Sequence, residues 1–280
     1  MEAFLPLGNS EAIMKVLKDK TVLITGGGSG IGKLMGELIL KKGGRLIIWD
    51  INPENIEKSL ADLSGLGKVG TYTVDVSNPE DVKKTAALVL QDHGVVDVLI
   101  NNAGIIVGKY FHEHHTRDIE RTMNINAVAP MYVTAEFLPG MMAQNSGHIC
   151  NIASSAGLVA NPKMSVYAAS KWAMIGWSDS LRLEMEQLDK NIGITTVNPF
   201  YIDTGMFSGV RSKVPILKPE KVAHKIIKAI EQERIFLTMP WSMHLVRLGQ
   251  GLFPIRFFDW FVGKVLGMYS TMDHFKGRTE

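Results

Sequence analysis

Short, continuous apolar runs recur along most of the chain and predict buried β-strands. Six such runs fall at residues 21–25, 45–50, 70–74, 95–100, 148–153 and 192–197. Their apolar positions follow one another without regular polar alternation, which indicates that both faces of each strand are covered. We therefore expect a sheet that lies between two layers of helices.

Helical periodicity fills the intervals between these strands. Apolar residues recur with helical spacing at residues 31–42, 79–92, 116–144 and 165–189. Alternation of strand and helix implies right-handed crossovers between parallel strands. The predicted fold is therefore α/β, a single Rossmann-type, doubly wound parallel sheet with helices on both faces. No internal repeat or flexible linker interrupts it, so residues 1–280 are interpreted as one domain.

The C-terminal extension, residues 212–280, has a different pattern. Residues 219–233 have the apolar face of one amphipathic helix, and residues 235–269 are rich in aromatic side chains but broken by charges. Such a segment could cover an apolar pocket, form a dimer surface or lie on a membrane. Ordinary packing against the main domain is equally compatible with the pattern.

Composition narrows the class of protein. The 280 residues are 46% hydrophobic and 21% charged, with a net charge of +2, and no basic stripe suggests a nucleic-acid partner. The single cysteine, Cys150, lies in an apolar run and indicates a reducing compartment. Residues 1–20 have no signal-peptide core, and nowhere do about 18 apolar residues follow one another, as a membrane-spanning helix requires. We expect a cytoplasmic protein.

A glycine-rich turn joins the first predicted strand to the first predicted helix. It contains Gly26, Ser29, Gly30 and Gly32. Glycines let the backbone approach a pyrophosphate closely, and the helix N-terminus offers unpaired N–H groups to the anion. A tight turn alone could explain the glycines, but the position between strand and helix favours a dinucleotide site.

Asp50 ends the second predicted strand, where a carboxylate can accept hydrogen bonds from ribose hydroxyls. The same charge repels a 2′-phosphate. Neither Ser29 nor Ile51 supplies a cation that would offset the repulsion. The sequence therefore predicts NAD as the cofactor, with NADP disfavoured, although Asp50 could instead cap a turn.

Tyr167 and Lys171 stand four residues apart on a predicted helix, so their side chains share one face. A tyrosine pKa is ordinarily about 10, and a nearby cation lowers it by favouring the phenolate. Ser154 follows another strand, at the sheet edge where ligands bind. The spacing favours an acid/base site, although a Tyr/Lys pair on a helix also occurs by chance.

Together, the glycine turn, the Asn101-Asn102-Ala103-Gly104 segment, Ser154 and the Tyr167/Lys171 pair resemble the short-chain dehydrogenase/reductase family. The resemblance covers residues 18–207 and implies an NAD(P)-dependent oxidoreductase of CH–OH groups. It implies that Tyr167 is the acid/base, Lys171 its partner, Ser154 the holder of the substrate oxygen and an asparagine the support of a water that relays protons. The cofactor-binding residues that it implies are Gly26, Ser29, Gly30, Ile31, Gly32, Asp50, Asp75, Val76, Asn102, Ala103, Gly104, Tyr167, Lys171, Ile202 and Thr204.

Two asparagines compete for the relay position. Asn126 fits the family spacing better than Asn124 does, because it lies 28 residues before Ser154. Ile202 and Thr204 match the family segment that contacts the nicotinamide. Phe200 replaces the usual glycine in that segment, which leaves the local backbone geometry open.

The region 198–207 resembles the branch of retinol dehydrogenases and 17β-hydroxysteroid dehydrogenases. Apolar residues around the expected site favour a hydrophobic alcohol or ketone, retinoid-like or steroid-like; they are Leu158, Val159, Met164, Met206 and Phe207. A 3-oxoacyl-thioester reductase is an alternative enzyme, and a cofactor-binding or lipid-surface protein without turnover is an alternative of another class. Relatives lead us to expect a homo-oligomer, and the C-terminal segment suggests peripheral membrane contact.

A histidine-rich stretch, residues 112–115, precedes the long predicted helix. It lacks the His-Glu-x-x-His spacing of a zinc site, because Thr116 stands where the second histidine would be. A loop is the better interpretation. We predict no bound metal.

Overall fold

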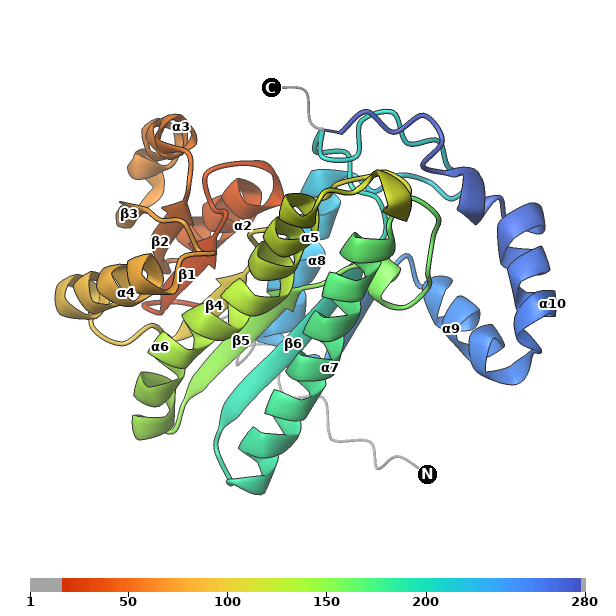
Figure 1. The fold of residues 1–280 in the computed structure, drawn as a ribbon. Helices are drawn as coiled ribbons and strands as arrows, with labels where there is room; N and C mark the ends of the chain where they lie inside the picture. Colours follow the sequence, from red (N-terminus) through yellow and green to blue (C-terminus); the bar gives the residue numbers. More distant parts are fainter. Residues whose placement is uncertain (1–16, 278–280) are drawn as a thin grey trace.

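The computed structural model describes residues 17–277, so most of the N-terminal stretch judged above to carry no signal sequence lies outside the described residues. The strands form one parallel sheet in the order β3-β2-β1-β4-β5-β6-β7 (Figure 1). They are β1 Thr21–Thr25, β2 Arg45–Asp50, β3 Val69–Thr73, β4 Val98–Asn101, β5 Gly147–Ile152, β6 Ile192–Pro199 and β7 Phe236–Met239.

Helices connect successive strands and cover both faces of the sheet. They are α2 Gly30–Lys41, α3 Pro53–Leu63, α4 Pro79–His93, α5 Thr116–Met123, α6 Ala129–Ala143, α7 Ser165–Gln187, α8 Pro219–Glu231, α9 Met243–Leu252 and α10 Ile255–Trp260. A π-helical segment, Asn124–Val128, joins α5 to α6, so the long helix predicted at residues 116–144 is present with a distortion in it. The predicted doubly wound α/β fold is confirmed.

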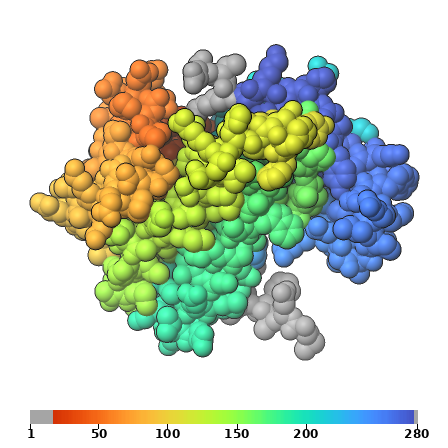
Figure 2. All heavy atoms as spheres, viewed as in Figure 1, coloured from red at the N-terminus to blue at the C-terminus, as the bar shows by residue number. Residues whose placement is uncertain are grey.

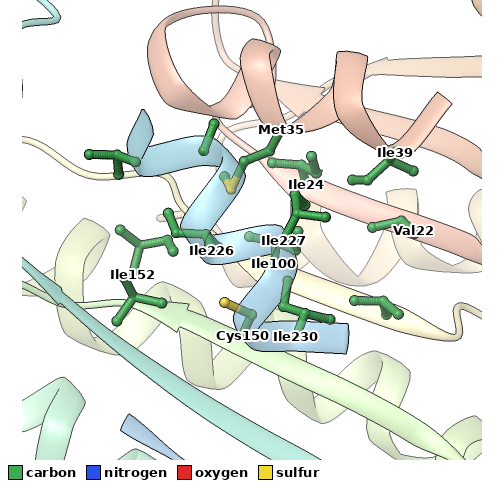
Figure 3. Close-up of a cluster of buried hydrophobic side chains, with 14 of the residues drawn as sticks. Val22, Ile24, Met35, Ile39, Ile100, Cys150, Ile152, Ile226, Ile227 and Ile230 are labelled. Atoms are coloured by element: carbon green, nitrogen blue, oxygen red, sulfur yellow. The ribbon is translucent and has the colours of Figure 1, made fainter. Parts of the chain in front are cut away.

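Alternate residues of β1, an interior strand of the sheet, face the two helical layers. Val22 and Ile24 of β1 point to a cluster with Met35 and Ile39 of α2 and the isoleucines of α8, which Figure 3 shows. Leu23, between them, belongs to the cluster on the other face, with side chains of α4, α6 and α7. All three β1 side chains are fully buried. This two-sided burial is why the strands lack polar alternation.

Two elements were not predicted. Helix α3 has clear start signals, since the Asn52 side chain accepts a hydrogen bond from the Asn55 N–H and Pro53 occupies the first turn. Strand β7 has only four residues and pairs in parallel with β6. Helix α8 therefore packs on the sheet and β7 belongs to it, although both lie within residues 212–280, the stretch interpreted above as an extension.

The order of strands reverses beside β1. The chain proceeds outward from β1 through β2 to β3 and then crosses to β4, which pairs with the opposite side of β1. In such sheets, ligands bind in the crevice beyond the carboxyl ends of the strands at this reversal. The fold thus places the glycine turn, which follows β1, beside the segment that follows β4.

Candidate active site

A cavity of about 500 Å³ lies at the carboxyl ends of the strands. All but two of the predicted site residues line it, the exceptions being Gly32 and Asn126. The predicted residues in its wall are Gly26, Ser29, Gly30, Ile31, Asp50, Asp75, Val76, Asn102, Ala103, Gly104, Ser154, Tyr167, Lys171, Ile202 and Thr204. The fold therefore gathers residues from seven separate segments into one cleft.

The glycine turn has a backbone that side chains would disrupt. Gly26 and Gly30 have φ values of +64° and +55°, in the left-handed region. A Cβ on Gly32 would lie 2.3 Å from the carbonyl oxygen of Gly26. Gly32 thus packs α2 against the turn instead of lining the cavity. This close packing brings the N-terminus of α2 to the cleft, as a pyrophosphate requires.

The Asp50 carboxylate is held by two backbone N–H groups in the wall of this cleft. Its Oδ2 accepts a hydrogen bond from Gly28 at 2.9 Å, and its Oδ1 accepts one from Asn52 at 3.0 Å. Asp50 is nearly buried, at 8% exposure, yet it still borders the cavity. Each carboxylate oxygen retains capacity to accept a further hydrogen bond from a ribose hydroxyl.

The segment after β4 is bonded directly to the glycine turn. The side-chain amide nitrogen of Asn102, Nδ2, donates to the carbonyl oxygens of Thr25 and Gly26, each at 3.0 Å. The backbone N–H groups of Asn102 and Ala103 donate to the Thr25 hydroxyl. These bonds fix the two sides of the crevice relative to each other. The resulting cradle of glycines, helix terminus and buried carboxylate fits a dinucleotide.

The three residues predicted to carry the chemistry meet at one end of the cavity. Ser154 follows β5, and Tyr167 and Lys171 lie on the first turns of α7, all three buried. The Lys171 Nζ donates to the carbonyl oxygen of Ile152 at 2.8 Å and lies 5.8 Å from the centre of the Tyr167 ring. A hydrogen bond joins the Ser154 and Tyr167 side chains.

Burial dominates the ionisation of this pair. Desolvation raises the pKa of Tyr167 to about 12, although the hydrogen bond from Ser154 lowers it in part. Desolvation also lowers the pKa of Lys171 to about 7. Burial is the largest cause of the rise in the Tyr167 pKa, and the expected lowering of that pKa by Lys171 stays a prediction.

Asn126 and Asn124 have different surroundings, although both lie in the π-helical segment. Asn126 is fully buried, and its side chain forms two hydrogen bonds with the backbone of Ile105, at 2.8 and 2.9 Å, and one with Ser170. Its Oδ1 lies next to Gly104, beside Lys171. Asn124 is exposed. Asn126 is thus bonded to Ile105, a residue of the cavity wall.

The segment after β6 closes the opposite side of the cavity. Ile202 and Thr204 line it, as the resemblance implied. The unusual Phe200 has an ordinary negative φ, donates its N–H to the Met239 carbonyl oxygen at 2.7 Å and packs its ring on Tyr201. The substitution therefore replaces glycine without requiring a left-handed backbone.

Some cavity residues were missed by sequence reasoning. Arg121 on α5 and Ile125 in the π-helical segment both line the wall, as do Ile51 and Asn55 near Asp50. Ile51 and Asn55 could have been inferred from their proximity to Asp50 in sequence. Arg121 could not, because no motif indicates which face of the predicted helix meets the cleft.

An apolar cluster surrounds the Tyr167 end of the site. It joins Leu158, Val159 and Met164 from the loop before α7 with residues far along the chain. Those distant members include Phe200, Tyr201, Val210, Met243, Phe258, Val262, Met268 and Met272. The Phe207 ring meets the Tyr167 ring edge-on, with 6.2 Å between the ring centres. An alcohol held at Tyr167 would have hydrocarbon around it.

The histidine-rich stretch forms turns rather than a ligand cluster. The Glu113 carboxylate accepts a hydrogen bond from the Tyr110 N–H, and Asp118 accepts one from the His115 N–H at the start of α5. Within residues 17–277, no group of three or more His, Cys, Asp or Glu side chains is arranged to hold a metal ion.

Comparison with known proteins connects this geometry to a chemistry. The family model described as short chain dehydrogenase matches residues 20–215. The chain is 36% identical over 271 residues to epidermal retinol dehydrogenase 2 of Mus musculus, covering 94% of this chain and 87% of that protein. It is 35% identical over 246 residues to estradiol 17-beta-dehydrogenase 11 of Pongo abelii, covering 87% and 82% respectively.

Solved structures show the same architecture. A short chain dehydrogenase/reductase from Burkholderia phymatum in complex with NAD superposes with a TM-score of 0.77 at 26% identity, covering 83% of this chain and 93% of that one. A metagenomic short-chain oxidoreductase in complex with NADP superposes with a TM-score of 0.69 at 25% identity, covering 79% and 95%. The two neighbours hold different nicotinamide cofactors in a shared fold.

Proposed function

Because the chain belongs to the short-chain dehydrogenase/reductase family, and is thus an NAD(P)-dependent oxidoreductase of CH–OH groups, we propose a specific reaction for it. It interconverts a hydrophobic alcohol and its carbonyl, of retinoid or steroid type, using NAD and Tyr167 as acid/base. The observation that carries the proposal is the meeting of Ser154, Tyr167 and Lys171 at the apolar end of the dinucleotide cleft.

The protein's own groups handle the proton. In the oxidative direction, Ser154 orients the substrate oxygen and Tyr167 removes its proton. A bound nicotinamide supplies the hydride acceptor. Since burial brings the pKa of Lys171 to about 7, its amine can exchange a proton with water at neutral pH, and Asn126 supports the water that carries the proton onward. The positive charge of a protonated Lys171 also favours the phenolate of its neighbour.

The preference for NAD rests on Asp50. Its carboxylate is anchored by backbone N–H groups where the adenosine ribose would lie, and a 2′-phosphate there would meet a buried negative charge. Titration with NADH and NADPH tests this preference. Tighter binding of NADPH, together with turnover of a 3-oxoacyl thioester, would instead favour the thioester reductase.

The hydrophobic substrate class is supported by two independent observations. The Tyr167 end of the cleft is bounded by an apolar cluster that includes Leu158, Met164 and Phe207. The named relatives are a retinol dehydrogenase and an estradiol dehydrogenase. We propose that their substrate classes extend to this chain.

Substitution of Tyr167 by phenylalanine tests the mechanism directly. The change removes the proton-transferring hydroxyl and keeps the ring, so we expect turnover of any accepted alcohol to fall by about 10²–10⁴-fold. Binding of NADH, measured by its fluorescence, should persist because the cradle is untouched. Turnover close to that of the wild type would contradict the role of Tyr167.

A further inference from the structure

The last helices carry an unusual concentration of exposed apolar side chains. In the described part of the chain, ten of the 24 exposed large hydrophobic residues lie between Trp241 and Val265. We call these ten the α9–α10 surface. Single exposed apolar residues are common on proteins, but a contiguous group of this size marks an interaction site.

Three members of this surface, including the most exposed one, lie at the turn between the two helices. Leu252 is 68% exposed, Phe253 51% and Ile255 74%. Helices α9 and α10 stand out from the edge of the sheet domain as a separate lobe, which is blue in Figures 1 and 2. The apolar turn is therefore accessible to a large, flat partner.

The opposite side of the same helices is packed against the site. Met243 of α9, Phe258 of α10 and the adjoining Val262 are buried in the apolar cluster that contains Tyr167. The helix pair therefore has two apolar faces, one toward the catalytic tyrosine and one toward solvent. Hydrocarbon lies between the exterior and the site.

Cations accompany the exposed apolar residues. Arg247, Arg256 and Lys264 are exposed among them. The segment 241–265 has a single acidic residue, Asp259, whose carboxylate accepts a hydrogen bond from the Tyr269 hydroxyl. Trp241 and Trp260, half or more exposed, add side chains that suit the boundary between hydrocarbon and water. Apolar, aromatic and basic residues together complement an anionic lipid surface.

We infer that the α9–α10 surface docks the protein on an anionic phospholipid bilayer and opens the apolar route by which a membrane-dissolved substrate reaches Tyr167. The second part of this inference rests on the proposed function. No helix within residues 17–277 is long and apolar enough to cross a membrane. The helix pair lies in the headgroup region, with Leu252 and Ile255 directed into the hydrocarbon.

A second copy of the chain is a poorer occupant of this surface. A two-fold interface places the same patch on both partners. Here it would bring three cations of one copy against three of the other, with one acidic residue already bonded to Tyr269. Like charges facing each other across an interface oppose association.

Vesicle binding by the full chain tests the docking. Vesicles of phosphatidylcholine alone are compared with vesicles of equal parts phosphatidylcholine and phosphatidylserine, and bound protein is measured after flotation. The double variant Leu252→Asp/Ile255→Asp should bind the anionic vesicles at least about tenfold more weakly, because it loses buried apolar area and adds negative charge. The matched control, Leu60→Asp/Leu88→Asp, changes exposed leucines of α3 and α4 and should bind as the wild type does.

Variants that neutralise basic residues measure the electrostatic contribution to vesicle binding. Arg247→Gln/Arg256→Gln/Lys264→Gln should remove most of the preference for phosphatidylserine, about tenfold or more, because each basic residue near the surface adds attraction. Lys58→Gln/Lys83→Gln/Lys84→Gln, with exposed lysines of α3 and α4, is the control and should keep the preference. Equal binding by all variants overturns the inference, as does a Leu252→Asp/Ile255→Asp variant that only loses self-association on a sizing column.

Turnover links docking to catalysis. A retinoid dissolved in anionic vesicles and a short, water-soluble alcohol are offered to the same protein. The Leu252→Asp/Ile255→Asp variant should lose turnover of the vesicle-borne retinoid relative to the soluble alcohol, and an unchanged ratio would contradict delivery from the membrane. If the wild type oxidises neither alcohol, the proposed function fails, while the flotation result still decides the docking.

Discussion

Tyr167 and Lys171 are both buried, and desolvation shifts each toward its neutral form. For Lys171, the pKa falls from 10.5 to about 7. Between these two values, the unfolded chain binds more protons than the folded protein, so this residue makes stability rise as pH increases from about 7 toward 10. The burial of Lys171 thus costs the folded protein stability at neutral pH.

The substitution Lys171→Met measures that cost. We expect the free energy of unfolding of the variant to vary less than that of the wild type between pH 7 and pH 10. The free energy of unfolding of the variant should exceed that of the wild type most near pH 7, by on the order of a few kcal/mol at most. Denaturant titrations of both proteins at several pH values give these free energies. Because both proteins share all other titrating groups, the contributions of those groups cancel in the difference. Parallel curves would show that Lys171 is not desolvated as described.

Asn126 acts through its hydrogen bonds to Ile105 and Ser170. Asn126→Ala leaves buried backbone groups of Ile105 without partners, which should lower the free energy of unfolding by about 1–3 kcal/mol. NADH binding should weaken as well, because the segment after β4 forms one wall of the cleft. Asn124→Ala, at an exposed neighbouring position, is the control. Equal effects of the two changes would contradict the assignment.

At the scale of elements, the approach of α2 to the glycine turn decides whether the cleft can accept a pyrophosphate. A Cβ at position 32 would lie 2.3 Å from the Gly26 carbonyl oxygen, which belongs to rigid backbone. Neither side of this contact can move without displacing the helix from the turn. The position of the helix N-terminus therefore depends on one missing methyl group.

Gly32→Ala should consequently destabilise the protein by about 1–3 kcal/mol, as overpacking does. It should also weaken NADH binding. Gly176→Ala on α7 is the matched control, because nothing lies within 4 Å of a Cβ there. Alanine at that helical position should stabilise by about 0.5–1 kcal/mol. Unaltered cofactor binding in Gly32→Ala, measured by NADH fluorescence, would show that the turn tolerates the shift.

At the scale of the whole molecule, two groups of exposed apolar residues suggest different partners. One is the α9–α10 surface. The other follows α6 and α7, where Tyr132, Trp172 and Leu183 are 37%, 49% and 52% exposed. The expected homo-oligomer stays a prediction, and these helices are where we place its interface.

Leu183→Glu tests that placement, because a buried carboxylate without a partner opposes association. We expect the variant to have a smaller mass than the wild type by light scattering on a sizing column. Leu88→Glu, on α4, should leave the mass unchanged. A wild-type protein that is monomeric, or a Leu183→Glu variant of unaltered mass, would contradict an interface on α7.

The sequence alone determined the class of fold and predicted many of the residues that line the cleft. Continuous apolar runs such as residues 21–25 indicate strands buried on both faces, because that pattern depends only on which positions must avoid water. The glycine turn, Ser154 and the Tyr167/Lys171 pair were predictable for a related reason. Their chemistry requires particular residue types at spacings that local structure imposes.

Tertiary structure alone decided what depends on contacts between distant segments. The rise of the Tyr167 pKa comes from burial among residues such as Phe207, and packing around the π-helical segment buries Asn126 against Ile105 while Asn124 is exposed. The four residues of β7 became a strand only by pairing with β6. Likewise, the aromatic tail divides into a face toward Tyr167 and a face toward solvent because of how α9 and α10 pack. The periodicity of apolar residues predicts which side chains of a segment are buried. It does not predict which distant segment of the chain covers them.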